Sequence, residues 1–302
     1  MEYKILIFDL TGGFTDMKKN LLSIIHFINE YKYKYKFTIK FCTARPQSFK
    51  DNIDKEVIKN NYMYDVKNLF DEKTFFIYDN YISFEKIKDE INEENTFNFY
   101  ISNEPLKIFK DIDFKKELTQ KYKEILNNID KKFIYIGGHF HFYAGYSIYN
   151  LLISEEFNKT IIPSKKILDS YNNFKKNIVF PYNFIHYRHE NDMKKYVEQF
   201  GLQNLCISID DIIKKNLFVN NDLKIYLATS NIENFYDKKI INMPIEKYNN
   251  LFYNKEKLCY FDENAFVDFL IGIDSIDFIG FSYSGFSVVL SELKNSKKYY
   301  DK

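Results

Sequence analysis

The chain lacks several features that would assign it quickly to a class of protein. Its 302 residues include no tryptophan, three cysteines, nine glycines and five prolines, and the formal net charge is only +1. The cysteines, Cys42, Cys206 and Cys259, stand far apart without metal-ligand spacing, which argues against a disulfide framework and against a zinc site. Because neither sign of charge dominates, we expect no nucleic-acid partner.

Long apolar runs are also absent from the sequence. No stretch approaches the roughly 20 residues of a membrane-spanning helix, so no membrane partner is expected. The first ten residues, MEYKILIFDL, carry Glu2, Lys4 and Asp9, and this pattern predicts a strand instead of a secretory leader. The sequence therefore predicts a soluble, cytoplasmic protein.

Aromatic residues are abundant, with 31 Phe and 26 Tyr beside many Lys, Asn and Ile. These residue types share A/T-rich codons, so base composition explains their number better than a dedicated aromatic surface does. A hydrophobic fraction of 45% is sufficient for real cores, and the length allows two domains.

Buried-strand patterns alternate with helical patterns along the whole chain, and small or polar residues separate them. Such alternation predicts an α/β fold with parallel sheets. We expect one domain over residues 1–160 and a second over 161–302. The predicted strands lie within 3–10, 36–42, 131–142, 182–188, 223–231 and 277–283, and the predicted helices within 14–28, 193–200, 264–273 and the stretch after Gly285.

Four of the predicted strand ends carry small or polar residues, in the segments 12–16, 186–192, 229–231 and 282–287. Ligands of open parallel sheets bind beyond the carboxyl ends of the strands. Helix N-termini there present free N–H groups and a positive dipole end, which suit phosphate. Arg188 adds a planar fork of donors that matches a phosphate group. These residues predict a site for a diphosphate-bearing ligand.

Motifs in the same segments resemble a known family. FIHYRHENDM (184–193) resembles the His-x-Arg-x-x-x-Asp motif of the GDP-fucose protein O-fucosyltransferase superfamily, and the plant members are the most similar. DFIGFSYSGFSVVLSELK (277–294) is similar to the late Ile-Gly strand and Ser-x-Phe-Ser/Thr helix start of the family. LTGGFTDMKKNLLSIIHFI (10–28) and YDVKNLFD (64–71) resemble two further elements, in the family's order.

The resemblance implies a GT-B fold, in which two Rossmann-like domains face each other across a cleft. It implies that the C-terminal domain binds GDP-fucose, that Arg188 contacts the diphosphate and favours departure of GDP, and that His186 positions the nucleotide. The N-terminal domain would lie on the acceptor side. The other donor-binding candidates, from the resemblance or from the strand ends, are Gly12, Gly13, Phe14, Thr229, Ser230, Ser284, Gly285, Phe286 and Ser287.

The implied reaction is inverting, metal-independent transfer of fucose to a protein or glycan acceptor. An arginine and helix dipoles can stabilise a leaving diphosphate without a divalent ion, so we expect no cofactor beyond the donor substrate. A carboxylate that accepts the proton of the acceptor would assist the transfer, and Asp16 is the candidate. Relatives place Asn or Glu in this loop, where the present chain has Gly12, Thr15 and Asp16.

Some polar residues have ordinary structural explanations. Asp210 and Asp211 follow Ser208 and fit the first turn of a helix better than a metal site. Asp192 fits a helix start as well as it fits a ligand. His139 and His141 have no third metal ligand nearby in the sequence.

Three alternatives to the fucosyltransferase remain open. LIFDLTGG (6–13) resembles the strand-borne aspartate of haloacid-dehalogenase-type phosphatases, but Thr11 stands where these enzymes have a second aspartate. A non-catalytic module that binds a nucleotide sugar or glycan would use the same strand ends. A third alternative keeps the transfer reaction with a different nucleotide-sugar donor.

Overall fold

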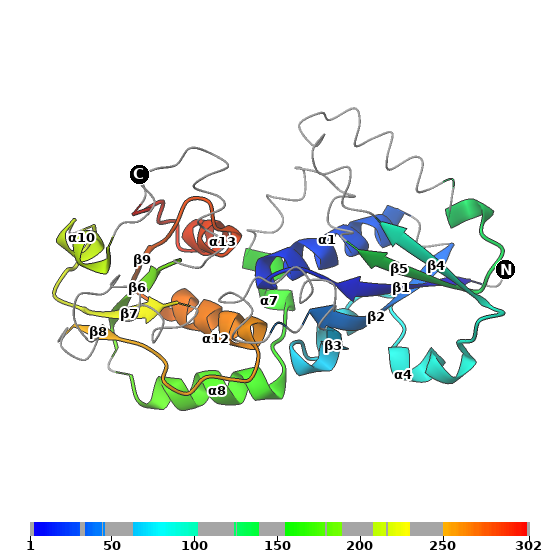
Figure 1. Cartoon of the computed structure of the whole chain (residues 1–302), viewed down its shortest axis with the longest axis horizontal. Coiled ribbons are helices and arrows are strands. Elements are labelled where there is room, and N and C mark those ends of the chain that lie inside the picture. Colours follow the sequence, from blue (N-terminus) through cyan, green and yellow to red (C-terminus); the bar gives the residue numbers. More distant parts are fainter. Residues whose placement is uncertain are drawn as a thin grey trace. The chain divides into compact units, whose positions relative to one another are not determined.

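The computed structural model describes most of the regular structure of the chain and is shown in Figure 1. It divides the protein into two compact units. Unit 1 comprises Met1–Thr43 and Met63–Ser164, and unit 2 comprises Ala44–Tyr62 and Lys165–Lys302. The described residues are 3–30, 34–43, 45, 63–101, 124, 126–138, 155–178, 180–188, 208–215, 217–229 and 250–300.

Unit 1 is built on a five-stranded sheet in the order β3-β2-β1-β5-β4. All neighbouring strands are parallel except β3, which runs antiparallel to β2 at the edge. Its elements are β1 (Lys4–Leu10), α1 (Phe14–Glu30), β2 (Tyr35–Thr43), β3 (Met63–Asp65), η2 (Val66–Asn68), α3 (Lys73–Phe76), α4 (Phe84–Ile87), η3 (Lys88–Glu90), β4 (Thr96–Ile101), β5 (Phe133–Gly138) and α7 (Glu155–Thr160).

Both faces of the sheet in unit 1 are covered. Successive side chains of a strand point to opposite faces. Ile5 and Ile7 of β1 pack with Ile87 of α4 and with Phe133 of β5. The intervening residues of β1, which include Leu6 and Phe8, are also fully buried and therefore face the side on which α1 lies. This double coverage explains why β1 reads as a continuous apolar run.

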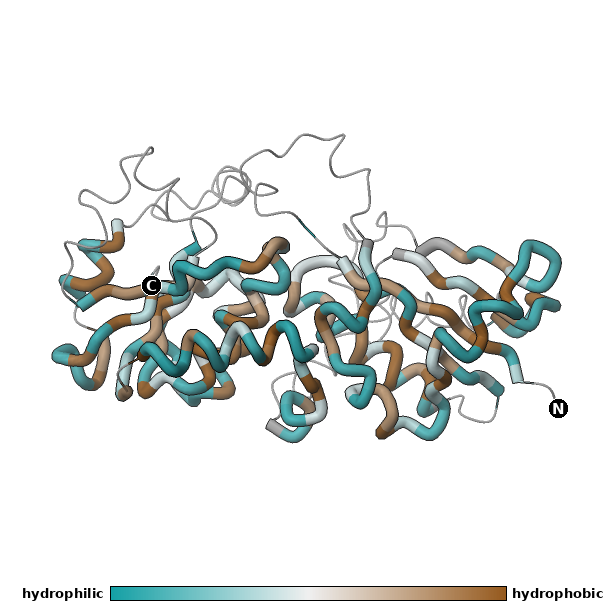
Figure 2. The backbone as a smooth tube through the Cα atoms, turned by 90° about the horizontal axis from the view of Figure 1, so that it is seen from below, coloured by the Kyte–Doolittle hydropathy of each residue, from teal (hydrophilic) through white to brown (hydrophobic). Residues whose placement is uncertain are grey.

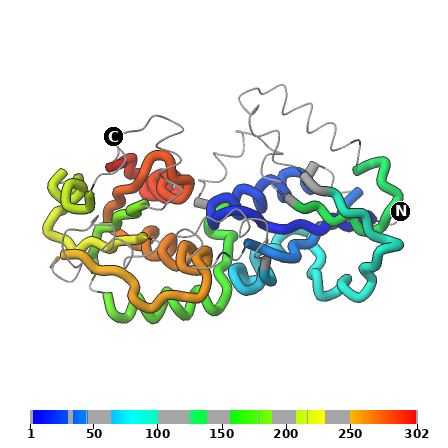
Figure 3. Tube along the Cα trace, in the orientation of Figure 1, coloured from blue at the N-terminus to red at the C-terminus, as the bar shows by residue number. Residues whose placement is uncertain are grey.

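Unit 2 is built on a four-stranded, all-parallel sheet in the order β8-β7-β6-β9. Figure 3 shows that β6, β7 and β9 lie side by side although they are far apart in the sequence. The elements are α8 (Lys165–Lys176), β6 (Tyr182–His186), α10 (Ile209–Lys214), β7 (Lys224–Ala228), β8 (Leu251–Phe252), α12 (Phe261–Asp274), β9 (Asp277–Ile279) and α13 (Gly285–Leu293).

The sheet of unit 2 is also buried on both faces. On one face, Ile185 belongs to a cluster that includes Ile212 of α10 and Tyr300. On the other face, Phe184 stacks on Tyr226, whose ring meets Phe174 of α8 edge-on at 5.2 Å between centroids. Hydropathy alternates between brown and teal along the helices that cover the sheets (Figure 2), as expected for helices with one buried face.

The segment after β2 is anchored in unit 2 by Arg45. Its backbone N–H donates to Asp262 Oδ2 at 3.0 Å, and its guanidinium pairs with the same buried carboxylate at the start of α12. The Phe261 N–H in turn donates to the Arg45 carbonyl at 2.8 Å. A bidentate arginine fixes both the position and the orientation of the groups that it joins. This contact therefore holds Arg45 against the first turn of α12.

The α/β class with two largely parallel sheets, as predicted from the sequence, is confirmed. The predicted helix from Phe14 and the helix start after Ser208 are confirmed, and the strand predicted over 182–188 is present as Tyr182–His186. The helix predicted over 193–200 lies outside the described residues, as do His139, His141, Asp192 and Ser230. None of the described helices is long and apolar enough to cross a membrane.

Candidate functional site

The carboxyl ends of β6, β7 and β9 meet at one edge of the sheet in unit 2, because these strands are parallel neighbours. His186 is the last residue of β6 and pairs in register with Ala228, the last residue of β7. Thr229 follows directly, and the turn after β9 leads into α13. The topology therefore brings together His186, Thr229 and the turn before α13, which belong to segments that the sequence singled out.

His186 is held to the start of α13 by a hydrogen bond between its Nδ1 and Ser287 Oγ at 2.7 Å. Ser287 is fully buried, and its Oγ also accepts the Phe281 N–H at 2.9 Å. If the serine hydroxyl donates to Nδ1, the imidazole proton resides on Nε2. Ser287 thus orients the ring, a role that the sequence motif alone does not reveal.

Aromatic packing fixes the other side of the His186 ring. The centroids of His186 and Phe286 lie 4.5 Å apart with an interplanar angle of 37°. Phe286 is itself braced by Phe269 of α12, whose ring meets it edge-on at 5.5 Å. Phe286 therefore acts in this structure as a support for His186.

The N-terminus of α13 provides backbone donors at the same edge. Ser284 precedes the helix, is 3% exposed, and its carbonyl accepts the first helical N–H, from Val288, at 2.9 Å. The N–H groups of Gly285, Phe286 and Ser287 have no acceptor within the helix, and the dipole adds positive potential there. Such a terminus suits an anionic ligand.

Thr229 supplies an independent indication of a ligand at this edge. The residue is 6% exposed, and its Oγ1 has no hydrogen-bond partner in the described part of the chain. A buried hydroxyl without a partner is costly in a native protein unless something else satisfies it. A polar ligand bound at the strand ends would do so.

Gly280, which directly follows β9, leaves the space in which the Ser287 side chain packs. A Cβ added at Gly280 would lie 2.6 Å from Ser287 Oγ and 2.6 Å from the ring of Phe278. Gly280→Ala should therefore destabilise the protein by about 1–3 kcal/mol, the usual cost of overpacking a filled core. The Tm from thermal unfolding measures this loss. Ile276→Ala is the control, because Ile276 precedes β9 and is 58% exposed. Equal stability of the two variants would contradict the packing described.

Arg188 is the second residue after β6 and is anchored through its backbone. Its N–H donates to Tyr300 Oη at 3.2 Å, and that hydroxyl lies 3.5 Å from the Arg188 carbonyl. Tyr300 is 1% exposed and stacks on Phe281 at 5.6 Å between centroids. The sequence gives no sign of Tyr300, since tyrosine is common throughout the chain.

In unit 1, the loop between β1 and α1 carries the other predicted residues. Gly12 has φ +89°, and its N–H donates to Thr43 Oγ1 at the end of β2, at 3.1 Å. The Gly13 carbonyl accepts the Met17 N–H at 2.9 Å and so begins α1. Phe14 is 3% exposed, so any ligand contact at this residue would involve its backbone.

Asp16 lies in the first turn of α1 and pairs with Lys19 at 3.1 Å. The two side chains are 45% and 31% exposed, so this surface ion pair contributes little to stability. An acidic residue in the first turn also stabilises the helix dipole. The role of Asp16 as a catalytic base stays a prediction.

Asp9 is a buried carboxylate near the end of β1. It is 7% exposed, its Oδ2 accepts from the Tyr135 hydroxyl, and its Oδ1 has no hydrogen-bond partner within the described segments. Burial raises the pKa of Asp9 to about 6, against partial compensation by Tyr135. A nucleophile of the phosphatase type must reach its substrate, and this burial disfavours that alternative.

Lys18 is a second buried ionisable group that the sequence analysis missed. It is 2% exposed, donates to Asn158 Oδ1 of α7, and lies 5.6 Å from the centroid of the Phe14 ring. Burial lowers the pKa of Lys18 to about 7. A lysine within an amphipathic helix pattern gives no signal of such burial, because lysines normally lie on the exposed face.

Metal-ligating side chains do not gather anywhere among the described residues, where no group of three or more His, Cys, Asp or Glu could hold an ion. Asp210 and Asp211 occupy the first turn of α10, and Ser208 Oγ accepts the Asp211 N–H at 3.1 Å. This is the structural role expected from the sequence.

No protein-family model matches this sequence, and no curated protein does so either. Solved structures do resemble it. The apo form of POFUT1 has a TM-score of 0.64 at 12% identity, covering 99% of this chain and 97% of that chain. POFUT1 in complex with GDP-fucose gives 0.64 at 12% identity, covering 98% of each chain. The α-1,6-fucosyltransferase NodZ, soaked with GDP-fucose, gives 0.53 at 11% identity, covering 96% and 92%.

A second NodZ structure, from Bradyrhizobium, gives the same TM-score of 0.53. Identities of 11–12% establish likeness of fold and nothing finer. The likeness extends over almost the full length of this chain and of POFUT1. It therefore includes both sheets and is not limited to one domain. The chain therefore has the fold of the GT-B fucosyltransferases POFUT1 and NodZ.

Proposed function

We propose that this protein is a GDP-fucose-dependent glycosyltransferase that transfers fucose to an oxygen of a protein or glycan acceptor. The observation that carries the proposal is full-length likeness to POFUT1 crystallised with GDP-fucose and with GDP, and to NodZ soaked with GDP-fucose. It coincides with the His-x-Arg and Ser-x-Phe-Ser motifs, which unit 2 brings to one sheet edge.

In this proposal, unit 2 binds the diphosphate of the donor. The N–H groups at the start of α13, the Thr229 hydroxyl and the Arg188 guanidinium are donors for phosphate oxygens. His186, oriented by Ser287 and Phe286, positions the nucleotide. Ser230, Ser284 and Gly285 complete the donor-binding set of unit 2, and a role for Gly12, Gly13 and Phe14 of unit 1 stays a prediction from the sequence.

The reaction breaks the bond between the anomeric carbon and the diphosphate oxygen while the acceptor oxygen bonds to that carbon. Negative charge grows on the leaving GDP, and Arg188 with the α13 dipole stabilises it. Attack from the opposite face inverts the anomeric centre, and Asp16 accepts the acceptor proton. Because preorganised donors supply the positive charge, the proposed transfer requires no divalent ion.

The compartment that fits this proposal is the cytoplasm. Cys259 is an exposed free cysteine, as is usual for proteins of reducing compartments. A cytoplasmic enzyme would act on intracellular proteins or glycans.

A thermal-shift panel tests the donor class. A ligand that binds only the folded state raises stability by about 2.7 kcal/mol at one hundred times its Kd. GDP and GDP-fucose should raise the Tm more than UDP-sugars or ADP-sugars at equal concentration, with EDTA present. Stabilisation by a uridine nucleotide alone, or only after addition of Mg²⁺ or Mn²⁺, would contradict the proposal.

A further inference from the structure

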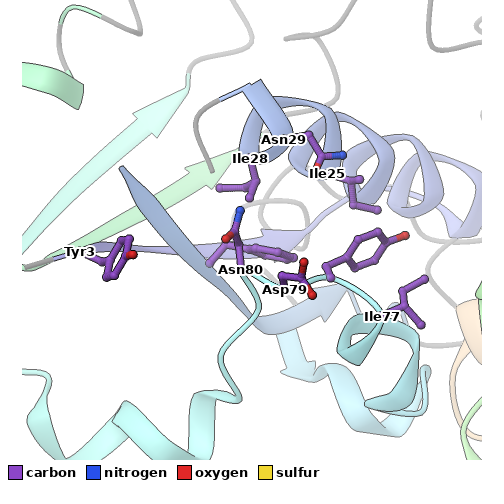
Figure 4. Close-up of a pocket in the computed structure, with 9 residues that line it drawn as sticks. Tyr3, Ile25, Ile28, Asn29, Ile77, Asp79 and Asn80 are labelled. Carbon is purple, nitrogen blue, oxygen red and sulfur yellow. The ribbon is translucent and has the colours of Figure 1, made fainter. Parts of the chain in front are cut away.

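Unit 1 contains a pocket of about 460 Å³ at the end of its sheet where β1 and β2 begin (Figure 4). Tyr3, which precedes β1, and Phe37, near the start of β2, both line it. The Gly12 loop lies beyond the opposite end of β1, a strand of seven residues that spans roughly 20 Å. The pocket is therefore separate from the loop predicted to face the donor, and its size falls in the usual range for small-molecule sites.

The floor of the pocket is apolar and continuous with the core. Ile28 and Ile25 of α1 are 1% and 8% exposed, and Phe37 is fully buried. Figure 4 shows Ile25 and Ile28 projecting from the helix toward the segment that carries Asp79 and Asn80. Ile25 presents most of the accessible apolar surface of this floor, which an apolar ligand face can contact.

Three polar side chains surround this floor: Asn29, Asp79 and Asn80. The Asn80 carbonyl accepts the Phe37 N–H at 2.9 Å, and the Ile82 N–H donates to the Phe37 carbonyl at 2.9 Å. The backbone that carries Asn80 is thus bound to β2, which fixes the position from which its side chain projects. The two amides both donate and accept, and the carboxylate accepts.

Tyr78 provides an aromatic wall that is also held in place. Its ring lies 6.3 Å from that of Phe37, tilted by 55°. Burial raises the pKa of Tyr78, and the side chain of Thr160 in α7 opposes this shift in part. Tyr3 stands at the rim with the Lys36 ammonium 5.1 Å from its ring centroid. The apolar floor, the ring and the amides are the features that a sugar ring requires, namely contact for its C–H face and partners for its hydroxyls.

We propose that this pocket binds a neutral saccharide. An anionic ligand is disfavoured because the described lining residues include the carboxylate of Asp79 and no cationic side chain, while the Lys36 ammonium at the rim lies over the ring of Tyr3. A cationic ligand would gain little, since Asp79 is exposed and an exposed ion pair is weak. Sugar hydroxyls, which both donate and accept, match the amides of Asn29 and Asn80. The inference depends on the lining of this pocket and not on the proposed transferase activity.

The absence of tryptophan from the chain allows a direct test. Ile77→Trp places one fluorophore at the rim, on a residue that is 56% exposed. Titration with the methyl glycosides of glucose, galactose, fucose and N-acetylglucosamine should give a saturable change in emission with at least one of them. Val219→Trp, at an 83% exposed position in unit 2, should show no change.

Asn80→Ala in the Ile77→Trp protein should weaken saccharide binding about tenfold, the effect of losing one good hydrogen-bonding group. Asn68→Ala is the matched control, because Asn68 is exposed and only its carbonyl forms a described hydrogen bond, with Ser164. Far-UV circular dichroism and the GDP thermal shift should be unchanged in both. Free arginine serves as the cationic probe in the same titration. Binding of arginine but of no glycoside, binding of none of these compounds, or equal glycoside affinity of the Asn80 and Asn68 variants would each overturn the proposal.

Discussion

Replacing Arg188 by alanine should lower the rate of fucosyl transfer by roughly 100- to 1,000-fold, or about 2.7–4 kcal/mol of transition-state stabilisation. The guanidinium is proposed to meet the diphosphate, whose negative charge grows as the bond to the sugar breaks. GDP binding should weaken less than turnover, because the contact is stronger in the transition state than in the ground state. Release of GDP from GDP-fucose by purified protein measures the effect.

The Arg188 variants should keep the backbone anchor, because the N–H that donates to Tyr300 Oη is present in alanine and lysine as well. Arg188→Lys should retain part of the activity, because lysine keeps the charge but loses the fork that contacts two oxygens. Lys224→Ala is the charge control, as Lys224 is exposed and begins β7 at the opposite end of the strand. A folded Arg188→Ala protein with near-wild-type turnover would show that this arginine has no catalytic part.

Replacing Lys18 by methionine should stabilise the protein near pH 6 and have progressively less effect toward pH 10. The pKa of Lys18 is lowered from 10.5 to about 7 by burial. Between these values the unfolded chain holds a proton that the folded protein does not, so wild-type stability rises with pH in this window. This difference between the pKa of Lys18 in the unfolded and the folded protein corresponds to about 5 kcal/mol. It is an upper limit for the increase in the free energy of unfolding that Lys18→Met gives at pH 6.

Urea unfolding of both proteins from pH 6 to pH 10 measures this linkage. Methionine is similar in volume, so the core should accommodate it, and the half-buried Asn158 amide can turn to water. Lys19→Met is the control, because the neighbouring Lys19 side chain is 31% exposed and pairs with Asp16. A stability gap between wild type and Lys18→Met that is independent of pH would contradict the burial of Lys18.

The sequence predicts the sheet framework well because hydrophobic periodicity is a local property. A strand buried on both faces, such as β1, appears as a continuous apolar run that ends in polar residues. Helix α8 was missed, since its sequence KKILDSYNNFKK is mostly polar and only Ile167 is buried among its residues. Its place depends on long-range contacts such as that between Phe174 and Tyr226, which no local pattern encodes.

The candidate site was predictable to the extent that strand ends and motifs reveal it. His186 and Ser287 were found separately, and the structure adds the hydrogen bond that joins them across 101 positions. Tyr300 and Thr43 were missed, because their contacts with Arg188 and Gly12 depend on tertiary folding. The pocket near Tyr3 and Asn80 was missed for the same reason, as its lining comes from four separate segments.

Product analysis tests the central claim most directly. Purified protein is incubated with GDP-fucose and EDTA, with and without peptide and glycan acceptors, and both GDP and the anomeric configuration of the released or transferred fucose are determined. We expect GDP formation and a fucosylated or hydrolysed product whose anomeric configuration is opposite to that of the donor. Tight binding of GDP-fucose with no GDP formed under any of these conditions would contradict it and identify a non-catalytic binding module.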